Sequence, residues 1–139
     1  MQDHKPTLLR TALLIGAVTD ALALLPMVFP FAAAIIWGGD GSTPASRIIV
    51  GYGAALMVGW TALLAWASRR PLERQFVAPL TMLVIAGLVV AEVAAVLAGE
   101  ISAARMLPTW CLQTCLLLLF GAAYHYPAPR LERRDGVPR

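Results

Sequence analysis

The feature that most constrains this chain is the recurrence of four long apolar segments separated by short polar ones. The segments cover approximately residues 8–37, 48–68, 76–98 and 106–124. Each has at least about the 20 residues that an α-helix needs to cross the hydrocarbon core of a bilayer. In lipid an isolated segment must satisfy its backbone hydrogen bonds internally, so each segment is predicted to be a transmembrane helix.

The composition also indicates burial in lipid. Hydrophobic residues make up 59% of the 139 residues and charged residues 14%, whereas soluble domains average about 45–50% and about 25%. A water-soluble chain of this length has too small a core to hide so much apolar surface. We therefore predict an all-α integral membrane bundle of four helices over residues 1–126. Residues 127–139, rich in proline and arginine, are predicted to be a disordered cytoplasmic tail.

The basic residues predict the orientation of the bundle. Only Arg47 and Arg105 fall on one side of the predicted membrane. Because short cytoplasmic loops are enriched in lysine and arginine, the other side is expected to be cytoplasmic, with both termini there, in an inner or plasma membrane. The nine residues on that side are Lys5, Arg10, Arg69, Arg70, Arg74, Arg130, Arg133, Arg134 and Arg139. No aromatic residues interleave with them in a manner suited to stacking bases, so lipid rather than nucleic acid is the expected partner.

Two prolines interrupt the first apolar segment. A helix over all 30 residues of segment 8–37 would be about 45 Å long, which is too long for a straight crossing. Pro26 and Pro30 each remove a backbone hydrogen bond and clash with the preceding turn. We expect a helix kink or break at these prolines, with a re-entrant or interfacial piece over residues 27–37 as the alternative.

Two carboxylates, Asp20 and Glu92, lie inside apolar segments. An ionised acid at the centre of a membrane helix costs about 2.5–3.5 kcal/mol on insertion scales, and such acids usually face the bundle interior. Apolar surroundings favour the neutral form of a carboxyl group, which brings its proton exchange closer to neutral pH. Both residues are therefore candidates for proton or ion exchange. The alternative is that each one hydrogen-bonds a neighbouring helix and fixes its register.

No lysine or arginine lies within the segments as a partner for these acids. Tyr52 and Gln113 are the expected polar neighbours of Glu92, because all three lie in the outer halves of their segments. Trp60 lies inside the second segment, where its indole N–H requires an acceptor. The remaining polar candidates within the segments are Thr19, Thr61, Thr81 and Thr114.

Small residues at four-residue spacing mark candidate contacts between helices, because membrane helices associate by close packing rather than by hydrophobic burial. One such stripe holds Ala12 and Gly16 in the first segment. The others are Gly51, Ala55 and Gly59 in the second segment and Gly87, Ala91 and Ala95 in the third.

These features predict a small membrane protein that moves or relays protons coupled to a solute or ion, with Asp20 and Glu92 as the exchanging groups. A homo-oligomer is expected, because four helices enclose little space for a pathway. The alternative is a structural subunit that docks to itself or to a larger membrane complex, and a lipid-modifying enzyme is a lesser one. The sequence has no phosphate-binding glycine loop, zinc-protease motif or nucleophile elbow, so no metal, cofactor or conventional enzyme is expected.

Overall fold

The computed structural model describes residues 4–29, 31 and 44–125 of the chain. These residues form helices and turns, without a strand among them. The helices are α1 (His4–Ala23), the short α2 (Leu25–Val28), α4 (Pro44–Ala67), α5 (Val77–Leu97) and α6 (Ala103–His125). Four stretches are long and apolar enough to cross a membrane: Lys5–Val28, Arg47–Ala67, Val77–Leu97 and Ala103–His125. The prediction of an all-helical chain with four such helices is confirmed.

The first predicted segment is divided where the prolines begin. α1 ends at Ala23, Leu24 forms a turn, and α2 carries Pro26 in its first turn. Proline is well suited to that position, because the first N–H groups of a helix have no intrahelical partner. Pro30 and residues 32–37 lie outside the described residues, as does the predicted tail over 127–139.

The last helix differs from its predicted bounds. α6 begins at Ala103, three residues before the predicted start of the fourth segment, and contains Pro108. This proline cannot supply the N–H that would bond the carbonyl of Ala104. It lies in the second turn, so the remainder of the helix continues without a further proline to His125.

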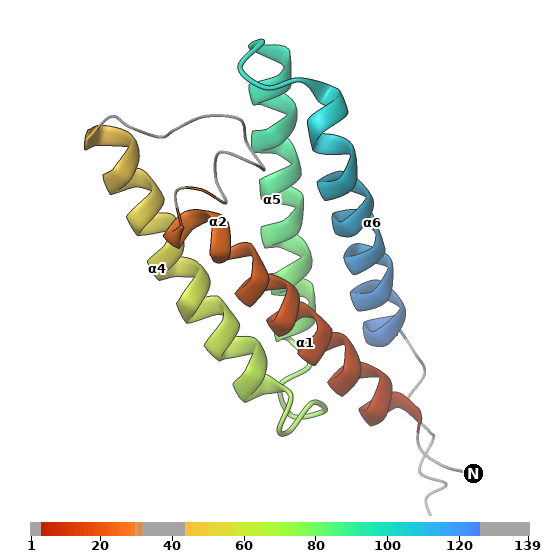
Figure 1. Cartoon of the computed structure of the whole chain (residues 1–139). Coiled ribbons are helices and arrows are strands. Elements are labelled where there is room, and N and C mark those ends of the chain that lie inside the picture. The colour runs from red at the N-terminus through yellow and green to blue at the C-terminus, as the bar shows by residue number, and fades with distance from the viewer. Residues whose placement is uncertain (1–3, 30, 32–43, 126–139) are drawn as a thin grey trace, which may run out of the picture.

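The four long helices run alternately up and down (Figure 1). The start of α1, the loop between α4 and α5, and the end of α6 lie at one end of the bundle, here called the terminal end. The α5–α6 loop and the start of α4 lie at the opposite end, here called the distal end. α1 packs against both α4 and α6, and α5 packs against α6, whereas α4 and α5 make few contacts with each other. The described part of the bundle is therefore least closed between α4 and α5.

The hydrophobic core lies at the terminal end. Its fully buried large side chains are Leu9 and Leu13 from the first half of α1, Leu64 from the end of α4, Val77 from the start of α5 and Phe120 from the end of α6. Phe120 packs so closely on Gly16 of α1 that a Cβ added to the glycine would lie 2.8 Å from the ring atom Cζ of Phe120. The absence of a side chain at residue 16 thus lets α6 approach α1.

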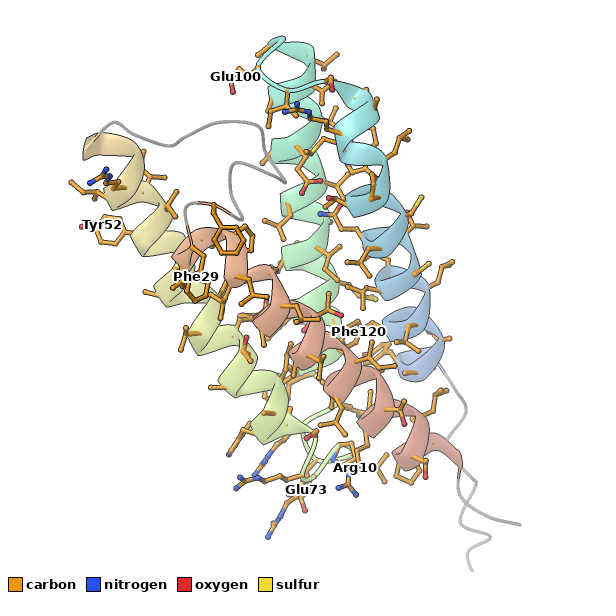
Figure 2. All side chains as sticks on the ribbon, viewed as in Figure 1. Arg10, Phe29, Tyr52, Glu73, Glu100 and Phe120 are labelled. Atoms are coloured by element: carbon orange, nitrogen blue, oxygen red, sulfur yellow. The ribbon has the colours of Figure 1, made fainter. Side chains whose placement is uncertain are left out.

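The loop between α4 and α5 is held at the terminal end by its own side chains. The guanidinium carbon of Arg74 lies 3.4 Å from the centroid of the Trp66 ring, which is a cation–π contact. Arg74 also donates a hydrogen bond to the Trp66 carbonyl, and Arg70 pairs with Glu73 at 3.3 Å. Figure 2 shows Glu73 at this end and Glu100 at the distal end.

The three predicted stripes of small residues have different environments. Ala12 and Gly16 are buried, and they face the core as the pattern predicts. Gly51, Gly59 and Gly87 are exposed, with no atom within 4 Å of an added Cβ. Within this chain, these three glycines therefore lie at no contact between helices, and a contact with another chain stays a prediction.

Candidate functional site

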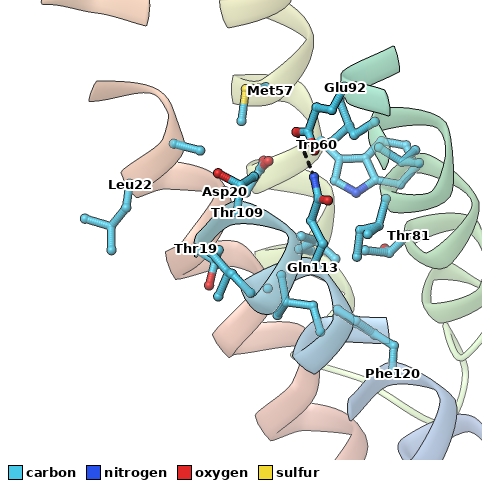
Figure 3. A pocket seen from close by; sticks show the side chains of 18 of the residues that line it. Thr19, Asp20, Leu22, Met57, Trp60, Thr81, Glu92, Thr109, Gln113 and Phe120 are labelled. Atoms are coloured by element: carbon cyan, nitrogen blue, oxygen red, sulfur yellow. Dashed lines mark hydrogen bonds between the residues drawn. The ribbon is translucent and has the colours of Figure 1, made fainter. Parts of the chain in front are cut away.

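A cavity of about 510 Å³ lies among the helices, adjacent to the core on its distal side (Figure 3). Its volume is within the range of about 300–1,000 Å³ that is typical of small-molecule sites. Leu64 and Phe120, both fully buried in the core, also line the cavity. Residues of α1, α2, α4, α5 and α6 all line the cavity, and most of them are apolar. The polar ones are Thr19, Asp20, Trp60, Thr81, Glu92, Thr109 and Gln113.

Asp20 reaches the cavity from the last turn of α1, just before the helix break. Its Oδ2 accepts a hydrogen bond from Oγ1 of Thr61 on α4, at 2.6 Å. This bond links α1 to α4, two helices that also pack against each other. The carboxylate is only partly buried, so it is tied to α4 while remaining accessible from the cavity.

Glu92 reaches the same cavity from α5, in the distal half of that helix. Its Oε1 accepts a hydrogen bond from Nε2 of Gln113 on α6, at 2.9 Å (Figure 3). Gln113 is only 6% exposed. The second oxygen of each side chain, Glu92 Oε2 and Gln113 Oε1, is buried and has no hydrogen-bond partner in the described part of the chain.

The structure therefore brings Asp20 and Glu92, the acids within two of the apolar helices, to a single cavity. Each acid lies on the first helix of one hairpin and accepts a hydrogen bond from the second helix, since Asp20 bonds to Thr61 and Glu92 to Gln113. Among the described residues that line the cavity there is no lysine, arginine or histidine. Among the described residues that line the cavity, the two acids are thus the only titratable side chains.

Tyr52 does not join this group. Its side chain is 71% exposed and it does not line the cavity. The tryptophan two turns later on α4, Trp60, lines the cavity instead, and its Nε1 is buried without an acceptor in the described residues. The sequence signal for Trp60 was a polar N–H inside an apolar segment, but depth along the helix does not reveal which face a residue occupies.

The threonines divide between the cavity and the helix backbones. Thr19 and Thr81 line the cavity, and Thr81 Oγ1 also donates to the Val77 carbonyl at 2.8 Å. Thr114 is exposed and bonds only within α6, to the Trp110 carbonyl at 2.8 Å. Over residues 4–29, 31 and 44–125, no three His, Cys, Asp or Glu side chains gather as a metal site would require.

The arrangement is suited to binding positive charge. Carboxylates in an apolar cavity can each take up a proton, and an ionised carboxylate there attracts a cation more strongly than it would in water. Comparison with protein-family models, curated proteins and solved structures found no match to this chain.

Proposed function

We propose that this chain is an integral membrane protein whose four long helices cross the bilayer, and that it exchanges protons in the transport of a solute or ion. The observation that carries the proposal is that Asp20 and Glu92 line the same cavity. Two acids held at separate helix contacts would need only a structural explanation. Two acids facing a shared space can pass a proton or a cation between them and the compartment to which that space opens.

The distribution of basic side chains supports an orientation with the terminal end in the cytoplasm. The described residues on the segments at that end include Lys5, Arg10, Arg69, Arg70 and Arg74, against Arg47 and Arg105 at the distal end. Short loops rich in lysine and arginine stay on the cytoplasmic side. In this orientation the core lies between the cavity and the cytoplasm, and the cavity lies on the outer side of the core.

Transport would then require the core at the terminal end to open. Phe120 packs closely on Gly16, with Leu64 beside it, where the cavity meets the core. A separation of α1 from α6 at this contact would give the acids access to the cytoplasm. Such alternating exposure of a fixed site is how secondary transporters move their cargo.

Proton flux tests the proposal. The purified protein is reconstituted into liposomes that contain a pH-sensitive dye, and protons are driven inward by a potassium diffusion potential. We expect the internal pH to fall faster with the wild type than with the double variant Asp20→Asn, Glu92→Gln, because neither amide can take up a proton in the acids' range.

The matched control is Glu73→Gln with Glu100→Gln, which removes two carboxylates at the ends of the bundle and none in the cavity. Its flux should equal that of the wild type. Equal rates for the wild type and the double variant in Asp20 and Glu92 would overturn the proposal.

A second candidate function is that of a subunit that docks to itself or to a larger membrane complex. The observation that favours it is the exposed face of α4, where Gly51 and Gly59 leave open space beside the helix. Small residues on such a face allow close approach of another membrane helix. A partner that copurifies at fixed stoichiometry in mild detergent, and that is lost in Gly51→Leu, Gly59→Leu, would favour this function.

A further inference from the structure

We propose that the cavity binds an organic ammonium ion, that is, a positively charged nitrogen with N–H groups attached to an apolar body. This proposal deepens the proposed function by naming the class of solute, and it rests on that function for its role in transport. Its basis is the combination in one cavity of unpartnered buried acceptors, negative charge and apolar walls.

The buried acceptors call for a ligand with N–H donors. Gln113 is only 6% exposed, and its Oε1 faces no donor in the described residues because its Nε2 is already bonded to Glu92. Glu92 Oε2 is likewise buried without a partner. A buried acceptor without a hydrogen-bond partner destabilises the protein, because its interaction with water is lost and not replaced. A ligand N–H group that reaches the two oxygens would remove this cost.

The charges in the cavity select a cation. Asp20 and Glu92 contribute up to two negative charges, and no basic side chain among the described lining residues offsets them. In apolar surroundings an ionised carboxylate is costly unless it is paired with a positive charge. An anionic ligand would be repelled by the two carboxylates, and a neutral ligand would leave their charge unpaired.

The apolar walls select an organic ion over an inorganic one. Met57, Val84, Leu88 and Leu112 line the cavity beside the polar groups, and the Trp60 indole adds an aromatic surface. Contact between such walls and a hydrocarbon or aromatic body is favourable, because it removes apolar surface from water. A bare metal ion would use only the oxygens, whereas Mg²⁺ and Ca²⁺ require six or more of them.

The same acids can bind either a proton or the ammonium ion, and this competition would couple the two. Asp20 from α1 and Glu92 from α5 are the titratable groups that line the cavity, and the described lining residues of α4 and α6 add none. Protonation of either acid removes the charge that the ammonium requires. Binding of the cation should therefore weaken as the pH falls, and its uptake should release protons.

The test measures binding of 2-phenylethylammonium to the full chain in lipid nanodiscs by calorimetry, with empty nanodiscs subtracted. The neutral analogue 2-phenylethanol and the anionic analogue 3-phenylpropanoate have similar apolar bodies. We expect saturable binding of the ammonium alone, with an affinity that decreases at lower pH.

Variants then test the cavity itself. Glu92→Gln keeps the size of the side chain and its ability to accept from Gln113, but it removes the charge. We expect it to weaken ammonium binding about tenfold or more, the effect of losing one charged hydrogen bond. Glu100→Gln removes a carboxylate in the α5–α6 loop, outside the cavity, and should bind like the wild type. Retention of a single symmetrical elution peak and of helical circular dichroism shows that Glu92→Gln is folded.

The outcomes separate this proposal from the proposed function. Equal binding of the three analogues, or unchanged binding in a folded Glu92→Gln, would overturn the ammonium proposal, even where proton flux through the wild type persists. Selective, pH-dependent binding of the ammonium would support it. Selective binding of the ammonium without any proton flux through the wild type would support the ammonium proposal and overturn the proposed proton exchange.

Discussion

At the scale of single residues, the hydrogen bond from Thr61 holds the carboxylate of Asp20 in place. The 2.6 Å bond uses one carboxylate oxygen, so the acid has a fixed position while the rest of the group faces the cavity. Such interhelical hydrogen bonds contribute only about 1 kcal/mol to the stability of membrane proteins. Their main effect is to specify how α1 and α4 face each other.

We predict that Thr61→Val destabilises the protein by about 1 kcal/mol, because valine has the shape of threonine and no donor for Asp20. Thr61→Ser restores the hydroxyl and should recover most of the loss. The measurement is the free energy of unfolding from titration with sodium dodecyl sulfate in mixed micelles.

Thr114→Val is the matched control for this substitution. Thr114 donates only to a carbonyl of its own helix and is exposed, so its loss should change the unfolding free energy by a few tenths of a kcal/mol at most. A loss in Thr61→Val no larger than in Thr114→Val would show that the bond to Asp20 does not hold α1 to α4.

The residues of the site were only partly predictable from the sequence. Asp20, Glu92 and Gln113 were identified because polar groups in apolar segments are costly and require partners. Tyr52 was named as a neighbour of Glu92 but does not line the cavity, whereas Trp60, which was not assigned to the site, does. Both lie on α4, and the choice between them depends on the rotation of that helix about its axis, which a uniformly apolar sequence does not encode.

At the scale of the helices, the termini are set by local chemistry. α5 ends in a left-handed turn at Gly99, whose φ is +76°. The N–H of Glu100 bonds to the Ala95 carbonyl at 3.0 Å, and the N–H of Gly99 bonds to the Val96 carbonyl at 3.0 Å. This is the Schellman pattern, which satisfies carbonyls that would otherwise be left free at the helix end.

We predict that Gly99→Ala destabilises the protein by about 1–2 kcal/mol, because a Cβ is unfavourable in the left-handed conformation. Gly99→Asn should cost less, since asparagine tolerates that conformation better. Gly87→Ala is the control on the same helix, where nothing lies within 4 Å of an added Cβ, and it should not destabilise. If unfolding titrations show that the two alanine variants lose the same free energy of unfolding, the positive φ angle of Gly99 is not the cause of the loss.

The helices were predictable because their signals are local, whereas their packing was not. Length and hydropathy predicted all four apolar helices, and Pro26 marked the place where the first one is interrupted. The stripes of small residues did not predict the packing, since Gly51 and Gly87 are exposed. In lipid every face of a helix is apolar, so no hydrophobic contrast distinguishes a face that packs from one that meets lipid.

At the scale of the whole molecule, the two ends of the bundle differ in how closely the helices pack. The core closes the terminal end, while the cavity lies on the distal side of that core. The α4–α5 loop, which carries Arg69, Arg70 and Arg74, also lies at the terminal end (Figure 1). In the proposed orientation, the cavity would lie on the outer side of the core.

Labelling of single cysteines tests this orientation. The native Cys111 and Cys115 are exposed free thiols, so both are first replaced by alanine. Glu73→Cys then marks the α4–α5 loop, and Glu100→Cys marks the α5–α6 loop. We predict that a membrane-impermeant maleimide labels Glu100→Cys on intact cells and Glu73→Cys only after permeabilisation, because two helix ends separated by one crossing lie on opposite sides of the bilayer. The reverse pattern would place the cavity on the cytoplasmic side of the core. Labelling of both positions on intact cells would contradict a crossing by α5.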